Sequence, residues 1–197
     1  GIIFTGGAMR LNDMTDEIKK HINFASDCFK HNNKILAICW GLQVCSTAAG
    51  GKVSPGKNGA HIGIATEVEI NEEGKKNPIY KNKRLKFNTP AFNFDEVVSL
   101  PKGSTLLASN PINKVMGLNF KSGLSNIWGI QYHPEITYSK MVSLIHFRKE
   151  RLLDKKAFSD DEEIDAHVKI IEDENKLSDK DSRMEELKNW LDFINEN

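Results

Sequence analysis

A chain of 197 residues is long enough for one domain with a sizeable hydrophobic core. Its 27 basic and 27 acidic residues leave a formal net charge of zero, so bulk charge gives no support to binding of a nucleic acid. No apolar run approaches the length needed to span a membrane, so we expect no membrane partner. The spacing of Cys28, Cys39 and Cys45 fits neither a metal site nor a disulfide framework, and it predicts reduced thiols in the cytoplasm.

The chain opens with a short apolar stretch over residues 2–4, followed by the turn Thr5-Gly6-Gly7. We read the stretch as a strand. Because the sequence begins inside it without an initiating Met, we expect an N-terminally incomplete piece. An amphipathic pattern over residues 12–32 then predicts a helix, with Thr15 or Asp13 as its N-cap.

The most informative stretch covers residues 34–51. The apolar run 35–38 is short enough for a buried strand, and the apolar residues from 42 to 49 then follow helical spacing until Gly50-Gly51. Cys39 lies where the strand must turn into the helix. This arrangement predicts a nucleophile elbow with cysteine in place of serine.

The position of Cys39 suits a reactive thiol. The start of a helix favours a thiolate through its free N–H groups and its dipole. The N–H of Trp40 is placed to donate to an oxyanion, and Gly41 permits close approach of the backbone. The alternative is that Cys39 is simply a buried core cysteine, which is common for this residue type.

The rest of the chain divides into a strand block and a helical end. Alternation predicts a strand over 64–70, a polar loop over 71–77, and further short strands near 85–87, 96–98, 105–108, 115–120 and 126–132. Helices are expected over 139–153, 160–174 and 181–194. We therefore predict an α/β fold with a mostly parallel central sheet flanked by helices, an antiparallel strand block and a C-terminal helical tail.

The tail differs from the body in charge. Residues 154–197 carry fifteen acidic side chains against seven basic ones, so the body is mildly basic. We expect two parts, a domain over residues 1–153 and an acidic helical extension over 154–197. The apolar stripe of Leu187, Trp190, Leu191 and Ile194 must be buried, either on this domain or on a partner.

His133 is the best candidate for a base that serves Cys39. It follows the last strand directly, in a turn fixed by Pro134, and Glu135 is close enough to orient its ring. Gly7 supplies a candidate second oxyanion donor. The alternatives are an ordinary strand-to-helix turn at His133 and a plain tight turn at Gly6-Gly7.

Together these motifs resemble the class I glutamine amidotransferase domain, with its Cys-His-Glu triad. The family's Gly-Gly turn corresponds to Gly6-Gly7. Its elbow of the form Gly-x-Cys-x-Gly-x-Gln corresponds to residues 37–43, and its histidine–proline–glutamate signature corresponds to residues 133–135. The tail resembles that of stand-alone members similar to the glutaminase domain of GMP synthase.

The resemblance implies a flavodoxin-like three-layer fold and hydrolysis of the side-chain amide of L-glutamine through a cysteinyl thioester. It implies catalytic roles for Cys39, His133 and Glu135, and an oxyanion hole built from Gly7 and Trp40. The substrate-binding residues it implies are Gly6, Gly41 and Gln43. No cofactor and no metal are implied.

Three positions depart from the family pattern. Ala37 stands where the elbow has its first glycine, and Ala8-Met9 follow Gly7 where proline or serine is common. His61 precedes Ile62-Gly63 where a glutamate is usual, and we expect it to be a neutral residue of a surface loop.

Several functions remain open at this point. The sequence lacks a Gly-rich phosphate loop followed by Lys, so the ammonia acceptor is expected on a synthase subunit in trans, or the ammonia is released. A homodimer is the other assembly we expect. The substrate is L-glutamine or another γ-glutamyl amide, since the same triad serves both. A third alternative is a catalytically silent domain that regulates a synthase.

Overall fold

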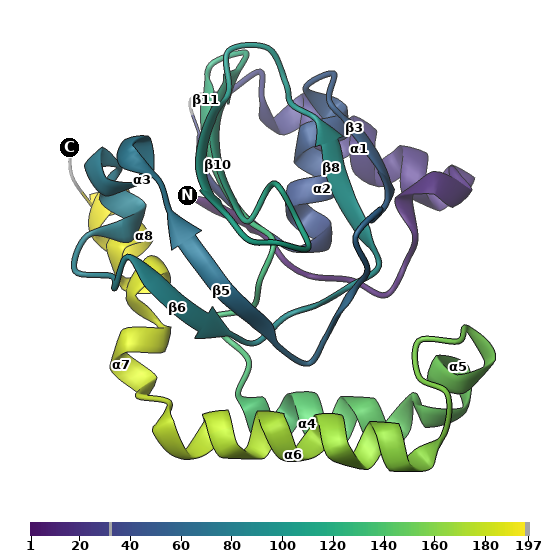
Figure 1. The fold of residues 1–197 in the computed structure, drawn as a ribbon. Helices are drawn as coiled ribbons and strands as arrows, with labels where there is room; N and C mark the ends of the chain where they lie inside the picture. Colours follow the sequence, from purple (N-terminus) through teal and green to yellow (C-terminus); the bar gives the residue numbers. More distant parts are fainter. Residues whose placement is uncertain (32, 196–197) are drawn as a thin grey trace.

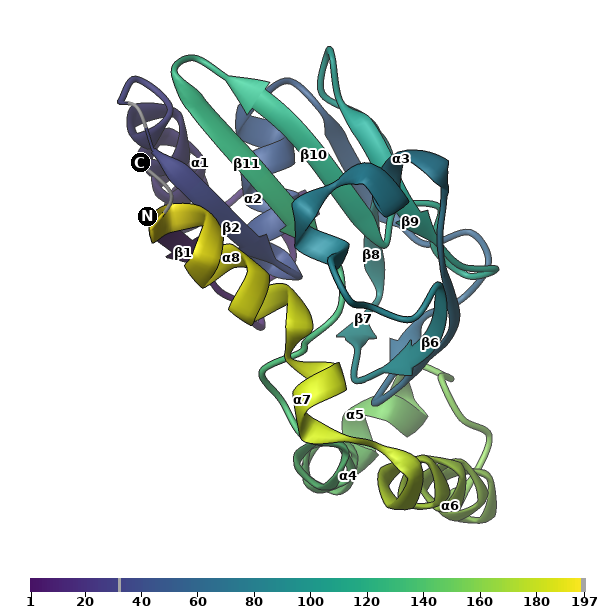
Figure 2. The same ribbon diagram turned by 90° about the vertical axis from the view of Figure 1, so that its left-hand side faces the viewer.

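The computed structural model describes residues 1–31 and 33–195. A seven-stranded sheet runs through its centre, with helices on both faces (Figures 1 and 2). Its strand order is β1 (Ile2–Phe4), β2 (Lys34–Ile38), β11 (Ser125–Ile130), β10 (Gly117–Ser122), β9 (Thr105–Ser109), β5 (Ala65–Ile70) and β6 (Lys86–Thr89). Two small ribbons pair β3 (Lys52–Pro55) with β8 (Asp95–Ser99), and β4 (His61–Ile62) with β7 (Phe92–Asn93). The predicted α/β class is confirmed.

The parallel part of the sheet is smaller than the sequence led us to expect. Within the described residues, parallel pairing joins β1 to β2 and β2 to β11, and the other pairs of this sheet are antiparallel. The lengths of the connections between consecutive strands explain this difference. A helix carries the chain from β1 to β2, whereas a tight turn joins β10 to β11 and forces them to run in opposite directions. The predicted antiparallel block thus extends the central sheet.

The helices form the outer layers of the molecule. They are α1 (Asp16–Cys28), α2 (Trp40–Ala48), α3 (Glu72–Lys76), α4 (Tyr138–Phe147), α5 (Lys149–Asp154), α6 (Asp161–Leu177), α7 (Lys180–Arg183) and α8 (Glu185–Asn195), with 3-10 turns at Leu11–Asp13 and Pro78–Tyr80. Figure 1 shows α1 and α2 on one face of the sheet and α3 and α8 on the other. Helices α4, α5 and α6 pack together at one end around a separate apolar cluster. None of the helices in the described part of the chain has the length and apolar character that a bilayer crossing requires.

Strand β2 lies inside the sheet, between β1 and β11, and both of its faces are apolar. Ile35 and Ala37 point into the cluster beneath α1 and α2, while Leu36 and Ile38 point into the cluster on the opposite face. This alternation follows from the two-residue repeat of a strand. The methyl group of Ala37 is accommodated there without exposure, so the departure from the family's glycine fits this core.

Three local predictions need correction. Helix α1 begins at Asp16 rather than near residue 12, because Thr15 caps it by accepting the N–H of Ile18 at 3.3 Å. The expected loop over 71–77 contains helix α3, which Asn71 caps through the N–H of Gly74 at 2.8 Å. The long helix expected over 139–153 is interrupted at Arg148, which separates α4 from α5.

The apolar stripe of the tail is buried on the domain itself. Trp190 is 4% exposed, and Leu187 and Ile194 pack against the same apolar cluster as β2 and β11. Leu191 is the exception, since half of its side chain is exposed. The last helix of the tail, α8, therefore crosses back over the sheet and covers part of one of its faces (Figure 2).

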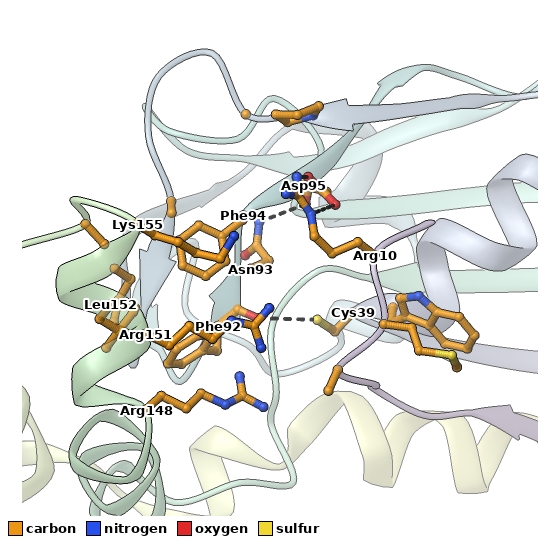
Figure 3. Close-up of a pocket in the computed structure, with 18 of the residues that line it drawn as sticks. Arg10, Cys39, Phe92, Asn93, Phe94, Asp95, Arg148, Arg151, Leu152 and Lys155 are labelled. Carbon is orange, nitrogen blue, oxygen red and sulfur yellow. Dashed lines mark hydrogen bonds and ion pairs between the residues drawn. The ribbon is translucent and has the colours of Figure 1, made fainter. Parts of the chain in front are cut away.

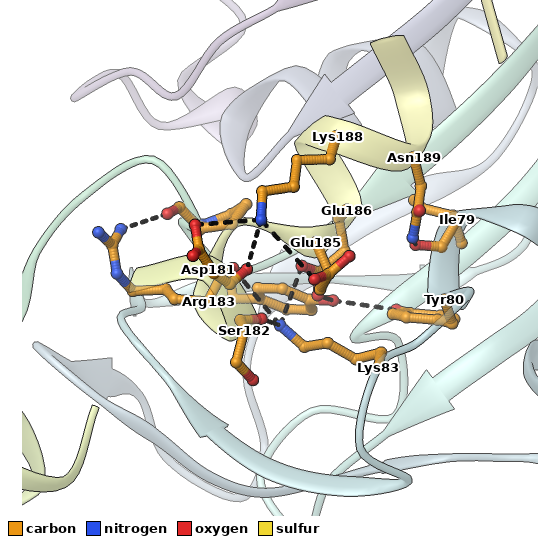
Figure 4. A network of polar contacts seen from close by, with 12 residues as sticks. Ile79, Tyr80, Lys83, Asp181, Ser182, Arg183, Glu185, Glu186, Lys188 and Asn189 are labelled. Atoms are coloured by element: carbon orange, nitrogen blue, oxygen red, sulfur yellow. Dashed lines mark hydrogen bonds and ion pairs between the residues drawn. The ribbon is translucent and has the colours of Figure 1, made fainter. Parts of the chain in front are cut away.

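A buried polar network fastens α8 to the sheet (Figure 4). Glu186 is fully buried and accepts hydrogen bonds from the Tyr132 hydroxyl at 2.6 Å and from the Lys83 ammonium at 3.0 Å. Asn189 donates to the carbonyl oxygens of Ile79 and Lys81 at 2.9 and 2.8 Å. Burial raises the pKa of Glu186, although Lys83 and Tyr132 oppose that rise. Because Lys83 is itself buried, removal of Glu186 would leave its charge without a carboxylate.

We therefore predict that Glu186→Ala lowers the free energy of unfolding by about 3 kcal/mol. Lys188→Ala is the matched control from the same helix, since the ion pair of Lys188 with Asp181 is exposed to solvent and its loss should cost less than about 1 kcal/mol. Denaturant titration of both variants measures the difference. Equal stability of Glu186→Ala and the wild type would show that the network does not hold the tail.

Candidate active site

The backbone at Cys39 has the strained conformation of an elbow. Its φ of 52° and ψ of −109° lie in a region that residues with a side chain rarely adopt, at a cost of about 1–3 kcal/mol. The N–H of Cys39 donates to Ile130 at 2.7 Å and continues the pairing of β2 with β11. Its carbonyl oxygen accepts the N–H of Gln43 at 3.2 Å and begins α2. The thiol is thereby fixed between a strand end and a helix start.

Gly41 explains how α2 can begin so close to the sheet. A Cβ at this position would lie 2.3 Å from the carbonyl oxygen of Phe4, at the end of β1. The residue faces β1 and is not among those that line the cavity beside Cys39. Its geometry is that of a close packing contact, and its contact with substrate stays a prediction.

The imidazole of His133 lies between Cys39 and Glu135. Its Nδ1 is 2.7 Å from Oε1 of Glu135, and its backbone N–H donates to Pro90 at 2.8 Å. Burial lowers the pKa of His133, but its interactions with Cys39 and with the Glu135 carboxylate outweigh this effect and raise the pKa to about 10. The three side chains that the sequence singled out are therefore together. The raised pKa of His133 favours an imidazolium at neutral pH.

The Gly6-Gly7 turn lies against this group. A Cβ on Gly6 would be 2.6 Å from Cε1 of His133, so the absence of a side chain lets the imidazole sit there. Gly7 faces the ring of Trp40, and its N–H has no hydrogen-bond acceptor among the described residues. The N–H of Trp40 is the first of α2, where a helix leaves such groups free.

A cavity of about 520 Å³ opens beside Cys39 (Figure 3). One side of it is lined by Gly7, Arg10, Trp40 and Gln43, and the other by the end of α5 and the turn after it. The guanidinium of Arg10 holds Asp95 through two hydrogen bonds of 2.6 and 3.2 Å. The Arg10–Asp95 pair therefore connects the loop that follows β1 with the start of β8, beside the cavity.

Gln43 is held by other amides as well as lining the cavity. Its Nε2 donates to the carbonyl oxygen of Asp95 at 2.8 Å and to Oε1 of Gln131 at 3.3 Å. Gln131 in turn donates from its Nε2 to the sulfur of Cys39 at 3.4 Å. Gln131 was not among the site residues predicted from the sequence. The signal was its position at the end of β11, two residues before His133.

His61 contradicts the expectation of a surface loop residue. It is 1% exposed, because both ring nitrogens have partners, Asn93 Oδ1 at 3.0 Å from Nδ1 and the Asn110 amide at 2.9 Å from Nε2. Burial lowers the pKa of His61, so the expectation of a neutral ring agrees with the structure. The residue fixes Asn93, whose side chain lines the cavity.

The turn that carries Glu135 is also held from the tail. Nη1 of Arg183 donates to the carbonyl oxygens of Pro134 and Ile136, the latter at 3.0 Å, and so contacts both neighbours of Glu135.

Among the described residues, no group of three His, Cys, Asp or Glu side chains is arranged to hold a metal ion.

Comparison with known proteins places this site in a family. The family described as Glutamine amidotransferase class-I matches residues 1–150. A γ-glutamyl-L-1-hydroxyisopropylamide hydrolase from a Pseudomonas species is 32% identical over 140 residues, which cover 70% of this chain and 47% of that protein. One subunit of the glutamine-hydrolysing GMP synthase of Methanocaldococcus jannaschii is also 32% identical over 140 residues, or 71% of this chain and 66% of that relative. The chain thus spans less than two thirds of either relative.

Solved structures agree on the fold. A glutamine amidotransferase from Thermotoga maritima superposes with a TM-score of 0.73 at 21% identity, over 99% of this chain and 78% of the other. A glutamine amidotransferase from Methylobacillus flagellatus superposes with a TM-score of 0.68 at 16% identity, over 95% of this chain and 74% of the other. The fold is that of the flavodoxin-like glutamine amidotransferases. The chain belongs to the class I glutamine amidotransferase family.

We predict that Glu135→Gln lowers the pKa of His133 from about 10 toward its ordinary value of 6.5, because the variant loses the negative charge beside Nδ1. The imidazolium, which the wild type keeps until pH rises through the raised pKa, is then lost at lower pH. Titration of the imidazole C–H signals by NMR measures the shift. Glu67→Gln on the exposed edge is the control and should leave His133 unchanged. A wild-type His133 that titrates near 6.5 would contradict the geometry.

Proposed function

We propose that this chain is a cysteine-dependent amidase that hydrolyses the side-chain amide of L-glutamine and releases ammonia for an acceptor. The observation that carries the proposal is the grouping of the Cys39 thiol, the His133 ring and the Glu135 carboxylate beside a cavity. The presence of all three side chains together argues against a catalytically silent domain.

The first half of the reaction transfers the glutamyl group to the enzyme. The thiolate of Cys39 attacks the carboxamide carbon, a C–S bond forms, and the carbonyl electrons move onto oxygen. The N–H groups of Gly7 and Trp40 donate to this oxyanion. As the intermediate collapses, the C–N bond breaks and the imidazolium of His133 protonates the departing ammonia.

The second half regenerates the enzyme. His133, now neutral, takes a proton from water as the water attacks the thioester carbon. A C–O bond forms, the C–S bond breaks, and glutamate leaves with the thiolate and imidazolium restored. Glu135 bonds Nδ1 throughout, so Nε2 is the nitrogen that faces Cys39.

The remaining predicted residues act around this centre. Gly6 leaves room for the imidazole, and Gln43 positions the substrate from the cavity wall through its amide. Gly41 keeps α2 close to β1, and its contact with the glutamyl group rests on the family resemblance. Gln131 supports the thiolate by donating to its sulfur.

Assembly and location follow from the same proposal. The relative from M. jannaschii is named as one subunit of a synthase, so we propose a synthase subunit in trans as the ammonia acceptor, with a homodimer as the alternative. Three cysteines without a disulfide fit a cytoplasmic protein. We propose residues 1–153 as the amidase domain and 154–197 as an extension that braces its sheet and its Glu135 turn.

A second candidate function is the hydrolysis of γ-glutamyl amides other than glutamine. The cavity of about 520 Å³ lies in the range of pockets that hold drug-sized ligands, roughly 300–1,000 Å³, and exceeds what glutamine needs. The Pseudomonas relative is named for an amide of this kind.

We predict that Cys39→Ala reduces release of ammonia and glutamate from glutamine by about 10⁴-fold or more, because the nucleophile is lost. In the wild type, 6-diazo-5-oxonorleucine should label Cys39. Cys28 and Cys45 are internal controls, because burial raises the pKa of both thiols and keeps them unreactive. Equal ammonia release by Cys39→Ala and the wild type would remove the proposal.

A further inference from the structure

The wall of the cavity opposite Cys39 is cationic. It is formed by Arg148, which precedes α5, and by Arg151, Lys155 and Lys156 in and after that helix. Figure 3 shows Arg148 and Arg151 extending from this wall toward the Cys39 side of the cavity. Arg148 lies over the ring of Phe92 at 5.0 Å, which fixes its guanidinium at the entrance.

None of these four cations forms an ion pair within the described part of the chain, because no carboxylate there lies within 4.0 Å of any of them. Lys149 provides the contrast, because it belongs to the same helix, does not line the cavity, and pairs with Asp161 at 2.6 Å. Asp95, whose carboxylate lies at the cavity, is already paired with Arg10. The wall therefore presents positive side chains without ion-pair partners to a ligand that enters the cavity.

Mutual repulsion accompanies this arrangement. Burial, and then the charge of Arg151, lower the pKa of Arg148. A protein that gathers like charges on one wall of a cavity loses stability there, and an anionic ligand removes that cost. Glutamine is a poor match, since it is a zwitterion with no net charge and needs only part of the volume.

We propose that the substrate is a γ-glutamyl amide whose amine half carries a carboxylate, and that this carboxylate binds the wall formed by Arg148, Arg151, Lys155 and Lys156. The inference rests on the second candidate function, the hydrolysis of γ-glutamyl amides other than glutamine, and narrows its substrate class. The glutamyl half occupies the Cys39 end of the cavity, and the departing amine lies toward α5. On cleavage the C–N bond breaks, His133 protonates the nitrogen, and an amino acid leaves in place of ammonia.

The test compares two amides that differ mainly in charge at the amine end, γ-glutamyl-β-alanine and γ-glutamyl-ethylamine. We expect the wild type to favour the first by roughly tenfold in kcat/KM, and the preference to shrink as salt screens the wall. Arg151→Gln should bring the ratio toward one and Arg151→Glu should invert it, whereas Lys149→Gln should keep the wild-type ratio. A wild-type ratio of one, or an equal loss for both amides in Arg151→Gln, would overturn the inference.

A binding measurement separates this inference from the proposed function. Calorimetry with γ-glutamyl-β-alanine on Cys39→Ala, with and without Arg151→Gln, reports on the wall without any turnover. We expect about tenfold weaker binding in the double variant. If the wild type hydrolyses neither glutamine nor either of the two amides, the proposed function fails, and the binding measurement still decides whether the cationic wall recognises a carboxylate. If the wild type hydrolyses glutamine but Cys39→Ala binds γ-glutamyl-β-alanine with the same affinity with and without Arg151→Gln, the role of the wall is contradicted and the proposed function stands.

Discussion

The strained backbone of Cys39 is the constraint on which the rest of the structure depends. A positive φ at this residue ends β2 and begins α2 without a loop, so the thiol stands at the carboxyl end of a buried strand. The hydrogen bond from Cys39 to Ile130 holds the elbow to β11, the strand that leads to His133. One backbone contact therefore sets the spacing of the nucleophile and its base, and the buried apolar residues of β2 on both faces supply the energy that sustains the strain.

The polar groups around the elbow form a continuous chain of contacts. Gln43 reaches Gln131, and Gln131 reaches the sulfur. On the far side, Arg183 contacts both neighbours of Glu135, and Glu186 accepts from Tyr132, which precedes His133. Helices α7 and α8 are thus coupled to the turn that bears the base and its orienting carboxylate, whereas the cationic wall lies in and beside α5. Under our proposal, the placement of the catalytic groups and the choice of substrate depend on separate elements.

Much of the site could be predicted because its signals are local. The change of period at Cys39 and the His133-Pro134-Glu135 turn can both be read from a few adjacent residues. What the sequence could not reveal depends on distant partners. His61 can be buried because Asn93 and Asn110 form hydrogen bonds with its two ring nitrogens. Gln131 belongs to the site because its side chain donates to the sulfur of Cys39, which is 92 residues away in the sequence. The extent of parallel pairing was overestimated, because the strand periodicity does not show which neighbour a strand will choose.

The central claim is that Cys39 becomes acylated by a γ-glutamyl group, and trapping of that species tests it most directly. The full chain would be mixed with a γ-glutamyl amide, quenched in acid within the first turnover, digested, and analysed by mass spectrometry for a glutamyl thioester. The account predicts the adduct on the peptide that contains Cys39, and its absence in Cys39→Ala. An adduct on another residue, or hydrolysis that proceeds at full rate with no adduct on Cys39 at any time, would contradict it.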